Sequence, residues 1–350
     1  MFILYNEHSP GEDRIALTRN DILSEFYIYR AGAPDGFGDL HWARVTSRVP
    51  AMAGAFLALA DSVAFLPDTA CAEDVTEGDH LAVRITRAAQ GGKGPRVTAC
   101  LTDAELACAG PGPMRRLRRG PSPLDELRES YPAAEIRADA LPEKLASEIE
   151  ALGSPAIALP GGMTGSITPT AALTAIDLDS AASTAERAPK LAAQFAGNRA
   201  ALPELARQIR LRNLSGAILI DFSGLPARRR GALTADLSAA LAEDRIRPRL
   251  MGFTSLGFAE IRRPRLRPPL HEMLRGPHAA GLAALRRAVA EALAAPGRRL
   301  VLRAPPAVIA ALEADPAALD DAARAMTHRL VLRNDPALPG VTCLIEDERG

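Results

Sequence analysis

The chain has 350 residues, 47% of them hydrophobic, so it is long enough to bury a sizeable core and to form two or three domains. Lysine plus arginine equals aspartate plus glutamate at 42 each, so overall charge indicates neither a nucleic acid nor a membrane partner. The sequence shows no charged-then-apolar leader and no apolar run of bilayer length, which predicts a soluble, cytoplasmic protein. Cys71, Cys100, Cys108 and Cys343 show neither CxxC nor Cys–His spacing, which argues against a zinc site and against a disulfide scaffold.

The first hundred residues have the composition of short strands separated by glycine and proline, which is typical of a small barrel. Phe56 and Phe65 are the only aromatic residues between Trp42 and Tyr131. On neighbouring strands they fit either a surface that stacks on nucleic-acid bases or the barrel core, and the turn at Lys93 offers an amine to a phosphate. We expect strands at residues 2–5, 14–17, 22–29, 40–49, 53–59, 64–66, 80–87 and 96–101.

The rest of the chain begins with a stretch rich in proline, glycine and arginine, residues 108–140, which predicts a linker. Strands and helices then alternate, which implies a mixed α/β layer, and the tail beyond Gly276 adds a small αβαβ piece. We expect helices at residues 142–151, 202–211 and 231–243, and strands at 156–159, 165–168, 172–177, 217–222, 300–302, 329–332 and 341–345.

Arginine greatly outnumbers lysine and clusters at residues 115–119, 228–230 and 262–267. The guanidinium group is planar, always charged and able to bind in a bidentate manner, which suits phosphate. A solvated arginine face is the alternative interpretation of each cluster.

Two apolar, β-branched runs end on an aspartate, at Asp177 and Asp221. An ionised carboxylate at the end of a buried strand is costly to desolvate unless it is paired or binds a cation. Joined by a helix, the two strands would place both aspartates side by side at one edge of a sheet, which predicts a Mg²⁺ site. The alternative is that each aspartate caps the helix or turn that follows it.

A series of motifs follows in order along residues 156–270: LPGG at residues 159–162, TAALTAID at 170–177, the helix at 198–213, ILIDF at 218–222, GFAE at 257–260 and RLRP at 265–268. In this order the motifs resemble those of the ribonuclease E / ribonuclease G family of bacterial endoribonucleases. The resemblance covers most of the chain and is strongest between residues 156 and 270. The N-terminal part is similar to the family's S1-type OB barrel, and the tail is similar to its small αβ domain.

The resemblance implies an α+β protein in which RNase H-like and DNase I-like parts form the catalytic core. Each part of the chain then has an expected role. Residues 1–37 are strands packing on the α/β core, 38–107 an S1-type OB barrel that binds RNA, 108–140 a linker in place of the 5′-sensor, 141–275 the α/β catalytic core and 276–350 a small αβ domain.

The activity that the resemblance implies is Mg²⁺-dependent endonucleolytic hydrolysis of single-stranded RNA, in RNA processing, rRNA maturation or mRNA decay. Asp177 and Asp221 correspond to the residues that hold the magnesium ion in the family. Asp179 stands where the family has an asparagine, and we include it among the catalytic candidates. An aspartate there keeps an oxygen ligand, removes an amide donor and adds charge.

RNA-binding residues also follow from the resemblance. Phe56 and Phe65 correspond to phenylalanines that stack on bases, and Lys93 to a lysine that contacts phosphate. Arg265 and Arg267, in the RLRP motif, are expected to contact RNA as well.

Besides Asp179, the chain departs from the family pattern at two places. It has no Arg-Thr pocket for a 5′-monophosphate, and His271 to His278 replace the family's CPxC zinc link, so we expect a monomer or a homodimer through the tail domain. Two other functions stay open: an RNA-binding protein of the same fold with weak or lost catalysis, and a nuclease that acts on DNA.

Overall fold

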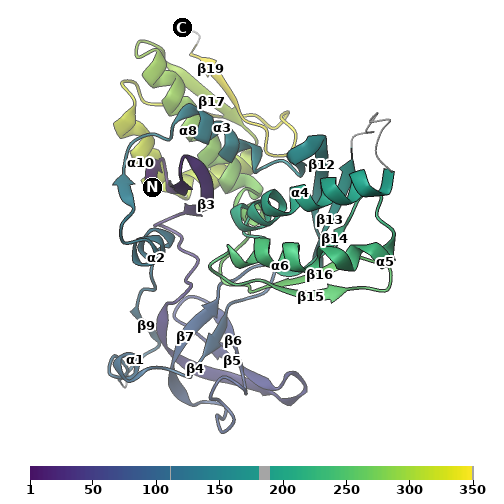
Figure 1. Ribbon diagram of the computed structural model, residues 1–350. Helices are drawn as coiled ribbons and strands as arrows, with labels where there is room; N and C mark the ends of the chain where they lie inside the picture. The colour runs from purple at the N-terminus through teal and green to yellow at the C-terminus, as the bar shows by residue number, and fades with distance from the viewer. Residues whose placement is uncertain (111, 181–189, 349–350) are drawn as a thin grey trace. The chain divides into compact units, whose positions relative to one another are not determined.

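The computed structural model describes residues 1–110, 112–180 and 190–348 (Figure 1). Its helices and strands confirm a mixed α+β protein. Within the described ranges, no helix has both the length and the apolar character needed to cross a membrane. The chain forms two compact units: Met1–Pro34 with Ser122–Ile149 and Leu270–Gly350, and Asp35–Pro121 with Glu150–Pro269.

The first unit contains two sheets. A four-stranded sheet has the order β10-β1-β2-β3, and a three-stranded sheet has the order β18-β17-β19. The strands are β1 (Phe2–Ser9), β2 (Glu12–Arg19), β3 (Ile22–Tyr29), β10 (Glu135–Arg137), β17 (Leu300–Ala304), β18 (Val331–Asn334) and β19 (Leu344–Asp347). The helices are α2 (Pro123–Ser130), α3 (Glu143–Ala151, which begins in this unit), α7 (Leu270–Met273), α8 (Gly276–Ala294), α9 (Pro306–Glu313) and α10 (Pro316–Ala325).

The N-terminal strands pack on the tail of the chain, within the first unit. The buried carboxylate of Glu12 accepts hydrogen bonds from Arg30 and from Arg286 of α8, each at 3.1 Å. At the β1–β2 turn, the backbone N–H of Gly11 donates to Asp321 of α10 at 3.2 Å. A buried carboxylate needs such cationic partners. That residues 1–37 also pack on the α/β core stays a prediction.

The second unit begins with a closed five-stranded barrel. Its strand order is β5-β6-β8-β7-β4, and pairing between β4 and β5 closes it. Alternate side chains such as Val45, Leu57, Leu66 and Val83 fill the barrel core. The elements are β4 (Leu40–Val49), η1 (Pro50–Met52), β5 (Gly54–Ala58), β6 (Val63–Pro67), β7 (His80–Arg87), β8 (Arg96–Thr98), α1 (Asp103–Leu106) and β9 (Arg115–Arg118), which pairs with β4.

Residues 108–140 were predicted to form a linker, and the structure corrects this. The segment contributes β9 to the barrel sheet, forms α2 and pairs β10 with β1 in parallel. Ser122 and Asp125 form a capping box at the start of α2, with Pro123 in its first turn. These local signals specify a helix within a stretch whose overall composition is that of a loop.

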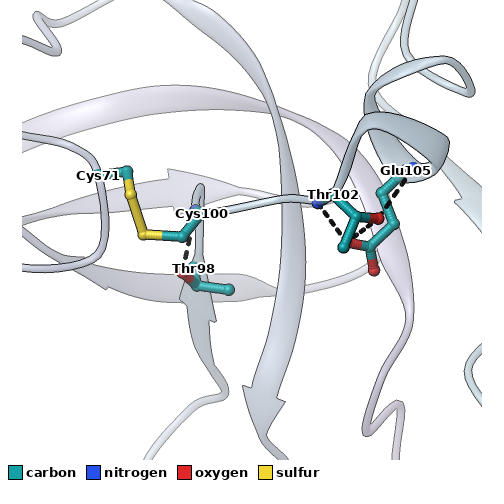
Figure 2. Close-up of a disulfide and its surroundings, with 5 residues drawn as sticks. All are labelled: Cys71, Thr98, Cys100, Thr102 and Glu105. Carbon is teal, nitrogen blue, oxygen red and sulfur yellow. Dashed lines mark hydrogen bonds between the residues drawn. A yellow bond between two sulfur atoms is a disulfide. The ribbon is translucent and has the colours of Figure 1, made fainter.

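A disulfide joins Cys71, which follows β6, to Cys100, which follows β8 (Figure 2). Beside it, the backbone N–H of Cys100 donates to Thr98 Oγ1 at 3.1 Å. Cys108 and Cys343 are free. The spacing of the four cysteines argues against a disulfide scaffold, and this one bond corrects that expectation. Disulfides persist mainly in oxidising compartments, and the cytoplasmic location stays a prediction.

Cys71→Ala is expected to lower the free energy of unfolding of the barrel by about 3–4 kcal/mol. The bond closes a loop between residues 29 apart in sequence, and releasing it gives the unfolded chain that much more freedom. Urea unfolding can be followed by the fluorescence of Trp42, the one tryptophan of the chain, which lies on β4. Cys108→Ala, at an exposed free cysteine, is the control, and equal unfolding midpoints for the two variants would contradict the prediction.

The other part of the second unit is a six-stranded sheet of order β11-β12-β13-β14-β16-β15. Strands β13 and β14 are parallel, and α4 connects them. Leu202 and Ile209 of α4 and Leu237 of α6 share one core with alternate strand residues, so both helices cover the same face of the sheet (Figure 1). The strands are β11 (Ala156–Ala158), β12 (Met163–Pro169), β13 (Leu173–Ser180), β14 (Gly216–Asp221), β15 (Arg249–Phe253) and β16 (Ala259–Arg263). The helices are η2 (Pro160–Gly162), α4 (Lys190–Leu211), α5 (Ala227–Arg230), η3 (Gly231–Leu233) and α6 (Thr234–Ala242).

Candidate active site

Asp177 and Asp221 are direct partners in the parallel register of β13 and β14. Side chains alternate between the two faces of a strand, and the neighbouring residues Ile176, Leu178 and Ile220 are buried under the helices. Both aspartates therefore project from the opposite face, where Asp177 is exposed and Asp221 is partly exposed. The arrangement expected from two strand-end aspartates joined by a helix is present.

Hydrogen bonds from two elements hold the segment that follows Asp221. The backbone N–H of Ser180 donates to Ser223 Oγ at 3.1 Å, which ties the end of β13 to the end of β14. Asn198 of α4 donates through Nδ2 to the carbonyls of Gln194 and Ser223, at 2.8 and 2.9 Å. The ends of the two strands are therefore fixed relative to each other.

An arginine accompanies Asp221. Nη1 of Arg230, from α5, donates to Asp221 Oδ1 at 2.5 Å and to the carbonyl of Gly257 at 3.2 Å, and Nε donates to the carbonyl of Leu225 at 2.7 Å. The Arg230 side chain is 12% exposed, whereas that of Asp221 is 42% exposed. Arg230 is thus fixed by backbone carbonyls and fixes Asp221 in turn, while part of the carboxylate faces solvent. Sequence reasoning did not select Arg230, although the cluster at residues 228–230 was its signal.

Asp177 and Asp221 fit a magnesium ion by the chemistry of their donor atoms. Magnesium prefers one or two protein carboxylates and keeps its remaining positions for water and phosphate. Across residues 1–110, 112–180 and 190–348, no three His, Cys, Asp or Glu side chains gather closely enough to form an all-protein metal cage. An open pair of carboxylates on an exposed strand edge suits magnesium better than zinc, which takes four closely placed ligands.

Asp179 lies two residues beyond Asp177 on β13 and is exposed on the same face. It pairs in register with Thr164 of β12, whereas the register with β14 ends at Asp177 and Asp221. Asp179 therefore flanks the aspartate pair from one side.

The two barrel phenylalanines are neighbours on the outer face of the barrel. Phe56 and Phe65 are direct partners of β5 and β6, and their ring centroids lie 5.5 Å apart in an edge-to-face arrangement. Both rings are partly exposed, whereas Leu57 and Leu66 beside them are in the core. The structure therefore excludes the alternative that the two rings are core residues. Stacking on bases stays a prediction.

Lys93 and Arg265 are both exposed. Lys93 ends a tight turn in which its backbone exchanges hydrogen bonds with Gln90 at 3.1 and 3.2 Å. Arg265 follows β16 and lies against Gly216, the first residue of β14, where a Cβ would collide with the guanidinium. Their contacts with RNA stay predictions.

Arg267 has a structural role, which corrects its prediction as an RNA contact. It is 5% exposed, and Nη1 donates to both carboxylate oxygens of Asp35 at 2.7 and 2.8 Å. Nη2 donates to the carbonyl of Pro121 at 2.6 Å, and the guanidinium lies 5.0 Å from the centroid of the Phe37 ring. The charge is already compensated and shielded from solvent.

Comparison with known proteins identifies the segment that contains the aspartates. Residues 139–266 match the Ribonuclease E/G family. This segment belongs to that family. The chain is similar to Ribonuclease E of Escherichia coli, with 38% identity over 130 residues, which are 37% of this chain and 12% of that protein.

Two further members of the ribonuclease E/G family give comparable matches. Ribonuclease E of a Nostoc species is 36% identical over 120 residues, which are 34% of this chain and 17% of that protein. Ribonuclease G of Escherichia coli is 38% identical over 81 residues, which are 23% of this chain and 17% of that protein. The chain thus matches less than a fifth of the length of each of these three relatives. The family match contains Asp177, Asp179 and Asp221 but not the barrel or the tail, where the expected resemblance stays a prediction.

Proposed function

We propose that the protein is a Mg²⁺-dependent endoribonuclease that hydrolyses phosphodiester bonds in single-stranded RNA. The observation that carries the proposal is the pair Asp177 and Asp221. The two residues are register partners on the exposed face of two neighbouring strands, within a segment that matches the ribonuclease E/G family. Three further features stay predictions. They are a role in cytoplasmic RNA processing, an RNase H-like and DNase I-like layout of the core, and dimerisation through the tail domain.

Each residue at the strand edge has a defined part in this chemistry. Asp177 and Asp221 would hold the magnesium ion through their carboxylate oxygens. When bound, such a cation lowers the pKa of water and neutralises charge that develops on the scissile phosphate. Arg230 fixes the rotamer of Asp221 and compensates part of the charge of two adjacent carboxylates.

The barrel would present the RNA to this edge. We propose that it is an S1-type OB barrel in which Phe56 and Phe65 stack on two bases and Lys93 contacts a phosphate. Partly exposed rings on an outer barrel face are what sequence-tolerant stacking requires.

Cleavage in the presence of Mg²⁺ is the direct test. The full chain is expected to cut an unstructured, AU-rich oligoribonucleotide in Mg²⁺, to leave it intact in EDTA, and to leave an all-deoxy oligonucleotide intact in both. Because no matching Arg-Thr pocket occurs in the sequence, substrates with a 5′-monophosphate and a 5′-hydroxyl should be cut at similar rates. Gel separation of labelled products measures the cleavage of each substrate in each condition. A strong preference for the monophosphate would show that a 5′-sensor is present after all.

A second candidate function is RNA binding with weak or lost catalysis. The ion pair between Arg230 and Asp221 favours it, because the guanidinium competes with a cation for the same carboxylate. RNA binding in EDTA without Mg²⁺-dependent cleavage of any RNA would support this candidate against the first.

Phe56→Ala combined with Phe65→Ala is expected to weaken RNA binding by roughly 30-fold or more, because each base stacked on an aromatic ring contributes about 1–3 kcal/mol. Fluorescence anisotropy of a labelled oligoribonucleotide in EDTA measures the affinity without cleavage. Met52→Ala, at an exposed apolar residue of the same barrel, is the control and should leave the affinity unchanged. An unchanged affinity in the double variant would remove the rings from the RNA site.

A further inference from the structure

Four side chains form a continuous row across the outer face of the barrel. Phe56 on β5 pairs with Phe65 on β6, Phe65 pairs with Arg96 on β8, and Arg96 pairs with Arg87 on β7. Residues directly opposite each other on neighbouring strands point to the same face of a sheet. All four side chains are exposed or partly exposed, in agreement with this placement. The row passes from two aromatic rings to two guanidinium groups.

The arginine end of the row opens into a cleft of about 710 Å³ between the barrel and the six-stranded sheet of the same unit. Two contacts join these parts beside the cleft: the backbone N–H of Ala88 donates to the carbonyl of Leu266 at 2.8 Å, and Ser215 Oγ donates to Gln90 Oε1 at 3.2 Å. Five arginines line the cleft against one carboxylate, that of Glu260. The arginines are Arg87, Arg96, Arg262, Arg263 and Arg265.

The charge of this cleft is largely uncompensated. Within the described parts of the chain, Arg87, Arg96, Arg262 and Arg265 form no ion pair. Burial, and then the like charges of Arg96 and Arg265, hold the pKa of Arg87 below its usual value. Gathering like charges in one cleft is unfavourable unless an anion occupies it.

Hydrogen-bond donors in the cleft also lack acceptors. Nη2 of Arg263, a residue 1% exposed, and Nε of Arg87 have no hydrogen-bond partner in the described residues. A buried donor left without an acceptor is costly. Gly216 allows the guanidinium of Arg265 to approach the start of β14, where any side chain would collide with it. The cleft therefore carries an excess of positive charge, and two buried donors of its lining residues lack acceptors.

The cleft leads along β14 toward the aspartate pair. Ala217 and Leu219 line it, and they lie on the same face of β14 as Asp221 because alternate residues share a face. At about 3.3 Å per residue, Leu219 is roughly 7 Å from Asp221 along the strand. An extended polyanion that occupies the cleft can thus continue onto the edge that carries Asp177 and Asp221.

We infer that Phe56, Phe65, Arg96 and Arg87, together with Arg262 and Arg265 of the cleft, form one binding track for the sugar–phosphate backbone of single-stranded RNA. The rings hold bases at the barrel end, and the guanidinium groups bind successive phosphates toward the sheet. That the bound RNA continues to Asp177 and Asp221 for cleavage rests on the proposed function. RNA binding by these six side chains does not depend on that function.

The test replaces two exposed arginines, one from each side of the cleft, in the variant Arg96→Gln/Arg265→Gln. Anisotropy of a labelled, unstructured twelve-nucleotide RNA is measured in EDTA over a range of salt concentrations. The dissociation constant should rise about tenfold, and the slope of log affinity against log salt should become shallower by about 1.4, which corresponds to two phosphate contacts. Arg44→Gln/Arg119→Gln removes the same charge from exposed barrel-side positions outside the cleft and should change neither quantity appreciably.

Further outcomes separate the competing explanations. Equal losses in both double variants would refute the track and indicate a general effect of charge. If inorganic phosphate or ATP raises the melting temperature of the wild type but not of Arg96→Gln/Arg265→Gln, while RNA affinity is equal in the two proteins, the cleft binds a small phosphate and the track is refuted. Track-dependent binding by a wild type that cleaves no RNA in Mg²⁺ would refute the proposed function and retain the track. If Arg96→Gln/Arg265→Gln cleaves RNA at the wild-type rate and the slope of log affinity against log salt is unchanged, the track is refuted and the proposed function is retained.

Discussion

Asp177→Asn and Asp221→Asn should each reduce Mg²⁺-dependent RNA cleavage by about a hundredfold or more, with RNA affinity in EDTA unchanged. Each substitution keeps the size of the side chain and removes a charged oxygen ligand from a two-carboxylate site. Even changes to residues that only support metal ligands typically cost about 10–100-fold in activity, so loss of a ligand itself should cost at least as much. Cleavage rates at several Mg²⁺ concentrations measure the effect.

The control for Asp221→Asn must also account for its ion pair with Arg230. Asp236→Asn removes a carboxylate from another Asp–Arg pair of the same unit, with Arg199 at 2.9 Å, and should leave cleavage unchanged. Arg230→Gln keeps both aspartates and tests whether the guanidinium positions Asp221 or only competes with the cation. A lower rate supports positioning, whereas a higher rate at low Mg²⁺ supports competition. Cleavage by Asp177→Asn at the wild-type rate would sink the assignment of the pair.

Asp179→Asn installs the residue that the ribonuclease E/G resemblance leads one to expect at this position. Removing the extra charge beside the scissile phosphate should raise the rate if Asp179 repels the phosphate, and lower it if Asp179 helps to hold the cation. The dependence of rate on Mg²⁺ separates the two, because only the second role changes the concentration needed for half-maximal activity.

Arg263→Met is expected to destabilise the second unit by about 3–5 kcal/mol, the largest stability effect among these predictions. The Arg263 side chain is fully buried and donates to Asp244 Oδ2 and Asn213 Oδ1, both at 2.7 Å, and to the carbonyl of Leu214 at 3.1 Å. Removing the guanidinium leaves the buried carboxylate of Asp244 without its cation, and an uncompensated buried charge is far costlier than a lost surface pair. Urea unfolding followed by Trp42 fluorescence and by far-UV circular dichroism measures the loss.

A double-mutant cycle with Asp244→Leu gives this prediction its control. Replacing both members of a buried ion pair by apolar residues is often close to neutral, so the double variant should be more stable than Arg263→Met alone. Additive losses would show that Arg263 contributes through packing rather than through its pairing with Asp244. Arg262→Met, at the exposed neighbouring position of β16, should change stability by less than about 0.5 kcal/mol.

Much of the fold could be predicted because the deciding patterns are local. The apolar, β-branched runs that contain Ile176 and Ile220 specify two strands, and Asp177 and Asp221 are outward residues of these strands. A helical connection between parallel strands then brings Asp177 and Asp221 into register. The helix expected at residues 231–243 is instead divided into a short 3₁₀ turn and α6. Residues 181–189, between β13 and α4 in the sequence, lie outside the described residues.

The features that sequence reasoning missed depend on contacts distant in the chain. Arg265 and Arg267 are two residues apart in one motif, yet one is exposed and the other is buried by Asp35 and Pro121. Periodicity cannot reveal which arginine meets a carboxylate more than two hundred residues away. The pairing of Cys71 with Cys100 depends likewise on the order β6-β8 inside the barrel, where strands that are not consecutive become neighbours.

The position of that disulfide has a mechanical consequence for the barrel. A closed barrel keeps its shape only if all neighbouring strands stay paired. Strands β6 and β8 share a single register pair, Phe65 with Arg96. The disulfide joins the segments that follow these two strands, so it strengthens the strand pairing that has the fewest register pairs in the barrel. The same pairing joins the two phenylalanines of the outer barrel row to its two arginines. Reducing the bond should therefore loosen β6 against β8, between the aromatic and the arginine ends of the row, while Asp177 and Asp221 keep their register on β13 and β14.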